Sequence, residues 1–541
     1  MATGLRRNNI RKLNDTHFDV CVVGAGINGA VSAAALATQG VRVALIDKGD
    51  FGGGTSSQSS NLAWGGIKYL ESREFGLIAK LCRSRNHLAA SYPSTVREIR
   101  FLTTIERGFR FHPIFVYIGT VLYWLVGRLA TRAPRYLSTE KLARHEPLID
   151  VADAKAGVEY SDCYLHDNDA RFVFGFVRKA INNGAVVANY VEAMAARRDE
   201  AGWGFTCRDS TDGRSIEFTA DVLVNACGPE VDQFNEIARV STSHSHAFSK
   251  GIHLIVDLEL RERRVLTFFA SDGRLFFVMP MGPKTCIGTT DTQVGSSDVR
   301  VTAADRDFVL ANANECLELE RPLTRADIIA ERCGVRPLAV DGQQAASDWM
   351  SMSRKHAIEV DASRAQVSIF GGKITDCINV GDEIVRQVKS LGVNTGDDYR
   401  IWYGEPDERT RNEFFHQAKR MSLDELTNPT SSEPLSVRFW RRYGNEAFEM
   451  LERIREDPAN AERMIEQAEY LRCEIEHTAR REIVVKLEDF LRRRSKISQV
   501  VRREDLLQSS GLIEACRVLF GEHAEARLQE YVDAEDGGCP R

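Results

Sequence analysis

The chain has 541 residues, of which 43% are hydrophobic and 27% are charged, and its formal net charge is −6. This length exceeds one simple domain, so two or three domains are expected. The weakly acidic balance excludes a chain-wide attraction to nucleic acid, and we expect no nucleic-acid partner. The 12 cysteines include no C-x-x-C pair, which argues against zinc-ribbon, iron–sulfur and thioredoxin-like centres, so no metal site is expected.

Residues 1–17 form a polar, basic arm that contains Arg6, Arg7, Arg11 and Lys12. The arm lacks the apolar run of a secretory signal, so the cytoplasm is the expected compartment. We interpret it as a solvated tail, and a weak contact with anionic lipid is the alternative.

A dinucleotide-binding unit follows in residues 18–47. An apolar strand leads into the glycine turn GAGING at 24–29, then an Ala-rich helix and a second strand that ends at Asp47. Gly24 permits the tight turn, Gly26 lets the backbone approach a pyrophosphate, and Gly29 lets the helix pack closely on the strand. The helix N-terminus offers N–H groups to phosphate, and the Asp47 carboxylate can bind a ribose diol.

The rest of the chain favours FAD over NAD at this unit. The pattern of Ala33, Leu36, Gly40 and Val43 is usual for flavoprotein units of this kind. A second GxGxxG is absent from the sequence, so no separate NAD(P)H domain is present to reduce a flavin. The sequence therefore predicts a flavoprotein that takes electrons from its substrate.

The hydroxyl-rich stretch Thr55–Ser60 comes a few residues after Asp47. It could wrap the flavin pyrophosphate and ribityl chain, and its composition equally fits an ordinary flexible loop. Helical patterns follow at about 74–91 and 115–128. The segment PIFVYIGTVLYWLV at 113–126 is too short to span a bilayer. A buried helix is our preferred interpretation, and a helix lying in one leaflet is the alternative.

Strand patterns dominate the middle of the chain. They occur near 184–191 and 222–227, and alternation between 245 and 290 predicts antiparallel sheet. A strand at 367–370 precedes a predicted helix from Lys373 to about Leu391. After about residue 400 the chain is Glu- and Arg-rich with helical periodicity. We therefore expect a FAD-dependent oxidoreductase region at 18–400, with FAD-binding and substrate subdomains interleaved, and a C-terminal helical domain at 401–541.

Motifs along nearly the whole chain resemble those of the FAD-dependent glycerol-3-phosphate dehydrogenases, in that family's order. They are TSSQSSNLAWGGIKYLE at 55–71, YSDC at 160–163 with DAR at 169–171, LVNACGP at 223–229, SKGIH at 249–253, IGTTD at 287–291, GVRPL at 334–338, FGGKIT at 370–375 and EIEHTARREIVVKLEDFLRRRSK at 474–496.

The resemblance implies an α/β (α+β) fold with a Rossmann-type FAD-binding domain, an antiparallel-sheet substrate domain like that of D-amino-acid oxidase, and a C-terminal all-α domain. It implies oxidation of sn-glycerol 3-phosphate to dihydroxyacetone phosphate, with electrons passed to membrane quinone. It also implies a peripheral enzyme on the cytoplasmic side of the membrane. The oligomeric state is not fixed by the sequence, and a homodimer stays open.

The resemblance also points to individual site residues. Arg336, beside Pro337, is a fixed cation that can bind phosphate bidentately, and Lys68 and Lys373 are further cation candidates. His253 resembles the family's active-site histidine, and Tyr69 adjoins Lys68. The helix after Gly372 would point its N-terminus at the flavin. The expected FAD-binding residues are Gly24, Ala25, Gly26, Asn28, Gly29, Asp47, Lys48, Thr55, Ser56, Ser57, Ser59, Ser60, Val191, Ala226, Gly228, Gly372, Lys373, Ile374 and Thr375.

The chain departs from the family pattern at two places. Trp64 stands where the family has histidine, and Lys68 where it has arginine, which keeps the charge but loses the planar fork. Asp376 replaces a neutral residue in a stretch that also loses a family arginine. Two alternatives therefore stay open: a flavin oxidase or dehydrogenase of a related phosphorylated or 2-hydroxy acid substrate, and a non-catalytic flavin-binding protein.

Overall fold

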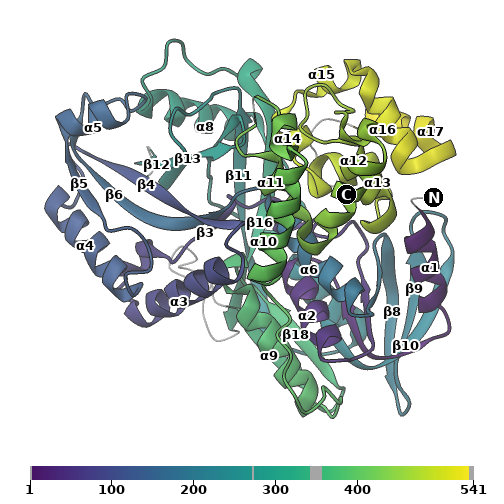
Figure 1. The fold of residues 1–541 in the computed structure, drawn as a ribbon. Coiled ribbons are helices and arrows are strands. Elements are labelled where there is room, and N and C mark those ends of the chain that lie inside the picture. Colours follow the sequence, from purple (N-terminus) through teal and green to yellow (C-terminus); the bar gives the residue numbers. More distant parts are fainter. Residues whose placement is uncertain (1–2, 271–272, 342–355, 430, 535–541) are drawn as a thin grey trace.

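The computed structural model describes residues 3–270, 273–341, 356–429 and 431–534. Two sheets and a group of C-terminal helices make up the fold (Figure 1). The first sheet has the strand order β17-β18-β10-β1-β2-β7, and the hairpin β8–β9 extends it from β10. All neighbours from β18 to β7 are parallel. Its strands are β1 (His17–Val23), β2 (Val43–Ile46), β7 (Val186–Ala188), β8 (Val191–Asp199), β9 (Gly202–Asp209), β10 (Ser215–Asn225), β17 (Ala357–Asp361) and β18 (Gln366–Phe370).

Three helices pack on one face of this sheet: α2 (Ile27–Thr38), α6 (Asp169–Asn182) and α9 (Cys377–Ser390). Every residue of α2 is buried, because the helix lies between the sheet and its two neighbours. Its alanines allow this close packing and form one hydrophobic core with the strands. The strand–turn–helix–strand unit predicted for 18–47 is thus confirmed.

The second sheet has the strand order β15-β11-β14-β13-β12-β4-β6-β3, with β16 paired to β11 and β5 paired to β6. Its pairs are antiparallel except β4 with β12, which confirms the antiparallel sheet predicted for 245–290. Its strands are β3 (Leu62–Ala63), β4 (Val96–Glu106), β5 (Arg135–Ser138), β6 (Ala154–Leu165), β11 (His244–Val256), β12 (Arg264–Phe269), β13 (Leu275–Met281), β14 (Lys284–Gly288), β15 (Thr292–Val294) and β16 (Ile328–Asp341).

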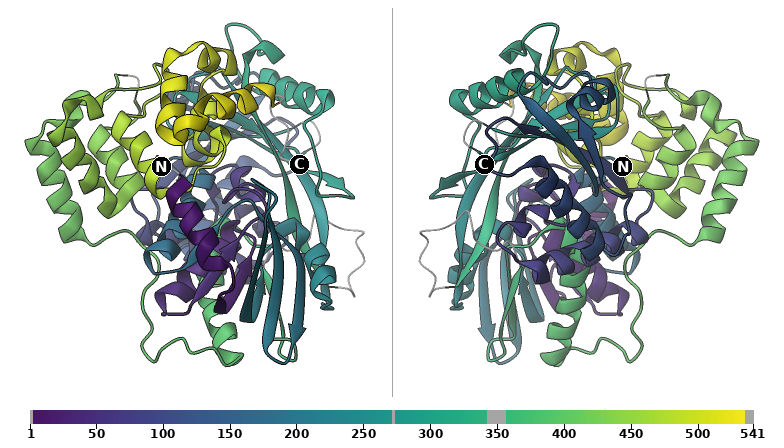
Figure 2. Two further views of the ribbon diagram at one scale, coloured as in Figure 1. Left: turned by 90° about the vertical axis from the view of Figure 1, so that its right-hand side faces the viewer. Right: turned by 90° about the vertical axis from the view of Figure 1, so that its left-hand side faces the viewer.

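The described residues beyond β18 are helical or irregular, as their periodicity predicts. Figure 2 shows α10 to α12 as a lobe beside the two sheets, with the last helices next to it. Two hydrophobic cores stabilise this part of the chain. Its main helices are α10 (Glu408–Arg420), α11 (Leu435–Tyr443), α12 (Ala447–Glu456), α13 (Arg472–Arg481), α14 (Ile497–Val500), α15 (Arg503–Gln508), α16 (Ser510–Phe520) and α17 (Ala524–Asp533).

The prediction of a solvated N-terminal tail is wrong. Residues Thr3–Leu13 form helix α1, which packs beside β7. Ile10 and Leu13 are buried, and the Asn9 side chain donates to the carbonyl of Val187 at 2.9 Å. Arg6 forms an ion pair with Asp209 at 2.8 Å. The prediction rested on the basic residues of this segment. The segment is an amphipathic helix, and its apolar side faces the protein.

The prediction of a buried helix at 113–126 is also wrong in part. Helix α4 (Pro113–Val126) buries only Pro113, Thr120 and Tyr123. Figure 1 shows it at the outer edge of the second sheet, far from the C-terminal helices. Across the described residues, each helix is too short or too polar to cross a bilayer. The exposed large apolar side chains of α4 are Ile114, Phe115, Ile118, Leu122 and Leu125.

Candidate flavin and substrate site

The glycine turn between β1 and α2 has the shape that a dinucleotide pyrophosphate requires. Gly24 has φ +96°, and a Cβ placed there would lie 2.5 Å from the carbonyl oxygen of Ala226. A Cβ on Gly29 would lie 1.7 Å from the carbonyl oxygen of Gly24, so no side chain fits. At Gly26 only the Ser56 hydroxyl approaches, at 3.2 Å, and the remaining space is open. The turn therefore fits the diphosphate of FAD.

We expect the variant Gly26→Val to lose its FAD. The two γ-methyl groups would occupy the open space in which a pyrophosphate approaches the backbone. The measurement is the ratio of flavin to protein absorbance after purification, with acid release to identify the flavin. A Gly40→Val variant is the control, since Gly40 has open space around it and lies at the other end of α2; its φ is +87°, so valine strains the backbone there more than at Gly26, where φ is −68°. Stoichiometric FAD in Gly26→Val would contradict the assignment of this turn.

Asp47 directly follows β2 and lies beside the glycine turn. Its carboxylate accepts hydrogen bonds from the N–H groups of Ala25 at 2.6 Å and Gly49 at 2.8 Å. Burial raises its pKa to about 6, although the two N–H groups oppose this. The Val191 N–H donates to the Asp47 carbonyl at 2.7 Å, which places the start of β8 beside it. Lys48 turns outward and pairs with Glu230 at 2.7 Å.

The hydroxyl-rich loop is fixed by bonds to several elements. The Ile27 N–H, in the first turn of α2, donates to the Ser56 hydroxyl at 2.9 Å. The Thr55 hydroxyl donates to the carbonyl of Val335 in β16 at 2.9 Å. Ser57 bonds within the loop, and the Ser59 N–H donates to the Asp169 carboxylate at 2.8 Å. Ser60 follows, partly buried. The loop thus connects the glycine turn to the second sheet.

The segment after β18 closes over the same region. The Asn28 side chain donates to the carbonyl of Gly371 at 2.9 Å, and Gly372 has φ +112°. A short turn, Ile374–Asp376, precedes α9, which begins at Cys377 instead of the predicted Lys373. Thr375 is buried in this turn. Ala226 lies against the glycine turn, and Gly228, with φ +59°, follows it by two residues in the chain.

His253 and Arg336 lie on neighbouring strands of the second sheet. Arg336 is opposite Ser249 in the β11–β16 pair, and its guanidinium lies over Gly251, where a Cβ would be 2.2 Å away. Gly251 and His253 are two residues apart and so share one face of β11. The guanidinium donates to the Thr289 hydroxyl at 2.9 Å and pairs with Asp291 at 3.2 Å.

His253 has two ring nitrogens that are buried without a hydrogen-bond partner among the described residues. Burial, then the charges of Arg336 and Arg332, hold the pKa of this imidazole well below its ordinary value. The ring is therefore neutral near pH 7 and has an acceptor nitrogen. A buried ring with unsatisfied nitrogens, next to an arginine, is what a polar ligand would satisfy.

Three further candidates come from two segments. The Lys373 ammonium lies 3.3 Å from the Tyr69 hydroxyl and 5.0 Å from the centre of its ring. Tyr69 is buried on the turn Ile67–Leu70, and Lys68 is exposed on the same turn. The structure thus brings Tyr69 and Lys373 together.

The departures from the family pattern have different surroundings. Trp64 packs against an apolar cluster that includes Tyr69 and Phe277. The Asp376 carboxylate accepts from Ser84 at 2.7 Å and Asn379 at 2.5 Å, and lies 3.0 Å from His356. Burial would raise the pKa of Asp376, but His356 and the other donors lower it below its usual range. The new acid therefore faces α3 (Phe75–Ser91) and His356, where its charge is compensated.

Sequence reasoning missed several buried charges around these segments. Asp162 accepts from Arg85 at 2.9 Å, from the Tyr123 hydroxyl at 2.6 Å and from the N–H of Gly65 at 3.1 Å. This links α4 and α3 to the loop before Lys68. Arg332 is fully buried and donates to the carbonyl of Ser59 at 2.5 Å. Asp162 lies within the matched YSDC motif, which is the signal that could have found it.

The comparisons with known proteins agree with this arrangement. A family model described as "FAD dependent oxidoreductase" matches residues 19–350, and one described as "C-terminal domain of alpha-glycerophosphate oxidase" matches residues 408–514. An X-ray structure of the glycerol-3-phosphate dehydrogenase from Bacillus halodurans, complexed with FAD, has a TM-score of 0.74 at 23% identity. The match covers 98% of this chain and 97% of that chain. The predicted D-amino-acid-oxidase-like fold with an all-α C-terminal domain is confirmed.

Two curated relatives show how the chain is related in sequence. Glycerol-3-phosphate dehydrogenase 2 of Mycobacterium tuberculosis is 30% identical over 509 residues, covering 90% of this chain and 82% of the relative. D-erythritol 1-phosphate dehydrogenase of Brucella abortus is 31% identical over 389 residues, covering 70% of this chain and 75% of the relative. The predicted FAD cofactor is confirmed by the family match. The chain belongs to the FAD-dependent glycerol-3-phosphate dehydrogenase family.

Proposed function

We propose that this enzyme oxidises sn-glycerol 3-phosphate to dihydroxyacetone phosphate and passes the electrons to a quinone in the membrane. The observation that supports this substrate most strongly is the closeness of His253 and Arg336 on neighbouring strands. A neutral buried imidazole and a guanidinium lie on one side of the second sheet. The hydroxyl-rich loop bonds to β16 one residue from Arg336, so the flavin loop adjoins this pair.

Each residue has a definite chemical task in this reaction. Oxidation of a secondary alcohol removes a hydride from C2 and a proton from its oxygen. Bound FAD supplies the hydride acceptor. A ring nitrogen of His253 accepts the hydroxyl proton, which requires the neutral imidazole that burial and Arg336 favour. Arg336, with Lys68 and Lys373, binds the phosphate, and Tyr69 orients Lys373. The glycine turn, Asp47 and the segments 55–60 and 372–375 hold the flavin.

The test measures the amount of product formed against the amount of acceptor reduced. Purified holoenzyme is mixed with sn-glycerol 3-phosphate and a soluble ubiquinone analogue, first without oxygen and then in air. We expect one dihydroxyacetone phosphate for each quinone reduced, and little hydrogen peroxide in air. Stoichiometric peroxide with no quinone reduction would instead assign an oxidase. No product with either acceptor would contradict the proposed reaction.

A four-carbon polyol phosphate is the second candidate substrate. The observation that favours it is the exposed Lys68 in place of a forked arginine, because a single ammonium constrains the phosphate less. The D-erythritol 1-phosphate dehydrogenase relative fits this alternative. A higher kcat/KM for D-erythritol 1-phosphate than for glycerol 3-phosphate would favour it.

The outer face of α4 supports membrane attachment. Ile114 and Phe115 begin its exposed apolar side, and Ile118, Leu122 and Leu125 follow at intervals of three or four residues, so all five share one side of the helix. Arg110 and Arg128 flank the helix, where they can meet anionic headgroups. A quinone acceptor is dissolved in the bilayer, so an enzyme that reduces it must lie against that surface. We therefore place α4 at the cytoplasmic face of the membrane, with its exposed side in the leaflet.

Replacing Phe115 and Leu125 by serine is expected to reduce sedimentation with anionic liposomes. Their side chains are 65% and 52% exposed, so the substitution leaves the core intact. Burial of each in lipid contributes about 1.5–3 kcal/mol. Trp124, by contrast, donates to the carbonyl of Thr131 at 2.6 Å and serves the fold.

The matched control replaces Ile401 and Leu426, which are exposed at 67% and 45% outside α4. The control should sediment like the wild type. Equal sedimentation of both double variants, or a wild type that stays in the supernatant, would contradict the membrane assignment.

A further inference from the structure

An arginine-rich turn of the C-terminal domain packs against the nucleotide-binding loop, the segment 47–60 that runs from Asp47 to the end of the hydroxyl-rich stretch. The turn is the short π-helix Asp489–Arg494, with the sequence DFLRRR. Arg494 donates through both terminal nitrogens to the two carboxylate oxygens of Asp50, each at 2.8 Å. Arg493 donates to the same carboxylate at 2.6 Å. Asp50 and both arginines are buried, so this is an ion-pair cluster shielded from water.

Asp50 belongs to the segment that connects Asp47 to the hydroxyl-rich loop. Its carbonyl accepts from the N–H of Gly53 at 2.9 Å, which closes a turn. Within that turn, the Gly52 N–H donates to the carbonyl of Ala25 at 2.9 Å. Ala25 is the residue between the first two glycines of the pyrophosphate turn. The two-bond contact of Arg494 with Asp50, the short turn that follows and one further hydrogen bond therefore connect the Arg494 guanidinium to the glycine turn.

The same arginine-rich turn holds a second segment beside Asp47. The Asp489 carboxylate accepts from the Tyr190 hydroxyl at 2.7 Å and from Arg493 at 2.6 Å. The Tyr190 N–H donates to the carbonyl of Gly49 at 2.8 Å, and Tyr190 directly precedes Val191. Burial raises the pKa of Asp50, but Arg494 and Arg493 outweigh it and lower this pKa to about 2. Asp50 is thus ionised, and its charge depends on these two cations for compensation.

We propose that Arg493 and Arg494 are positioning residues for the adenosine diphosphate half of FAD. By fixing Asp50 and Tyr190 from behind, they hold the glycine turn and Asp47 in the geometry that binds the dinucleotide. The C-terminal domain is then part of the flavin site, although its arginines contact other residues and not the flavin. This role is independent of which alcohol is oxidised and which acceptor is used.

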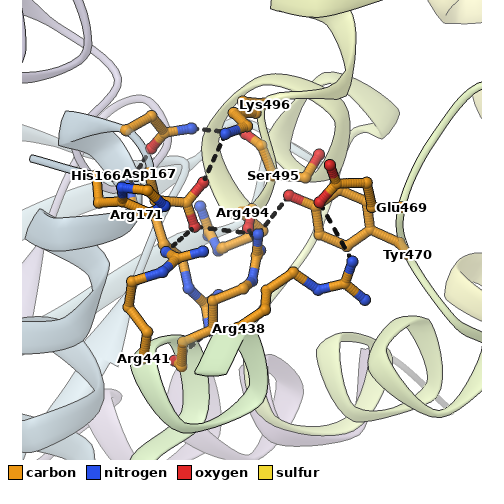
Figure 3. A network of polar contacts seen from close by, with 12 residues as sticks. His166, Asp167, Arg171, Arg438, Arg441, Glu469, Tyr470, Arg494, Ser495 and Lys496 are labelled. Carbon is orange, nitrogen blue, oxygen red and sulfur yellow. Dashed lines mark hydrogen bonds and ion pairs between the residues drawn. The ribbon is translucent and has the colours of Figure 1, made fainter. Parts of the chain in front are cut away.

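Another arginine at the same domain interface provides a closely matched control. Figure 3 shows the network around Arg441, which pairs with Asp167 at 2.8 Å and also with Glu433. Arg441 and Arg493 are both nearly fully buried, and each pairs with two buried acids. In each cluster a second arginine pairs with one of these acids and stays after the replacement: Arg442 with Asp167, and Arg494 with Asp50. The difference is that Asp50 lies in the nucleotide-binding loop.

The experiment compares Arg493→Gln with Arg441→Gln in the full-length chain. Apoprotein of each is titrated with FAD and, separately, with ADP, and thermal unfolding is measured without nucleotide. Both variants should lower the unfolding temperature. Arg493→Gln should weaken both FAD and ADP by about tenfold or more, because a buried charge pair is broken. Arg441→Gln should leave both affinities unchanged. Equal weakening by the two variants, or none by Arg493→Gln, would overturn the proposal.

A milder variant keeps the test decisive if Arg493→Gln fails to fold. Tyr190→Phe removes only the hydroxyl that donates to Asp489. We expect a smaller but measurable loss of FAD and ADP affinity, with the unfolding temperature of the apoprotein nearly unchanged. Affinities equal to those of the wild type would contradict the positioning role.

Discussion

Replacing His253 by alanine is expected to slow flavin reduction by about 10²- to 10⁴-fold, the contribution that a general base makes to proton transfer. The imidazole is buried, neutral and without a partner among the described residues, so it is ready to accept a proton from a bound hydroxyl. A base acts chiefly in the transition state, so kcat should fall while KM changes little. The measurement is stopped-flow bleaching of FAD-loaded enzyme by sn-glycerol 3-phosphate without oxygen.

The control for this variant is its flavin content. Because His253 lies in β11 outside the nucleotide-binding unit, His253→Ala should purify with stoichiometric FAD. Raising the pH should partly restore the rate, since a deprotonated alcohol needs no base. A fully loaded His253→Ala enzyme that bleaches at the rate of the wild type would mean that another group takes the proton.

Arg336→Ala is expected to raise KM by about 10- to 100-fold, with a smaller effect on kcat. Hydrogen bonds to a charged phosphate contribute about 1.5–3 kcal/mol, and the contact is present in ground and transition states alike. Steady-state kinetics with sn-glycerol 3-phosphate would measure both constants. Arg336→Lys should recover part of the affinity, since it keeps the charge and loses the fork.

The pair Arg336–Asp291 requires its own control. Removal of the guanidinium leaves the Asp291 carboxylate facing the Ser249 hydroxyl, which donates to it and carries no charge. Arg336→Ala combined with Asp291→Asn removes this remaining negative charge. If the double variant regains the KM of the wild type, repulsion by Asp291 explains the loss, and Arg336 does not bind the phosphate.

The local parts of the site could be predicted from the sequence because their geometry is set by neighbours along the chain. Gly24 and Gly29 are required by contacts within one strand–turn–helix unit, and the structure gives each a backbone atom where a side chain would be. The placement of Asp47 beside Ala25 follows from the same unit. In such motifs, the spacing of the residues along the chain determines their positions in space.

Contacts between distant segments could not be predicted in this way. Asp50 and Arg494 are separated by 444 positions, and neither residue carries a pattern that points to the other. The prediction that helix α4 is buried was wrong for a different reason. Nearly all of its residues are apolar, so the sequence has no polar side that shows which face meets solvent. Asp376 suggested a changed substrate site, but its Ser84 and His356 partners lie in other segments and turn it toward α3.

The reaction proposed for this site is the reduction of bound flavin by sn-glycerol 3-phosphate. The most direct measurement is a single turnover: FAD-loaded wild-type enzyme is mixed with sn-glycerol 3-phosphate without oxygen, and its yellow absorbance is followed. We expect complete bleaching with one dihydroxyacetone phosphate formed per FAD, and no bleaching with the enantiomer, sn-glycerol 1-phosphate, at equal concentration. A flavin that stays oxidised with sn-glycerol 3-phosphate would contradict this proposal.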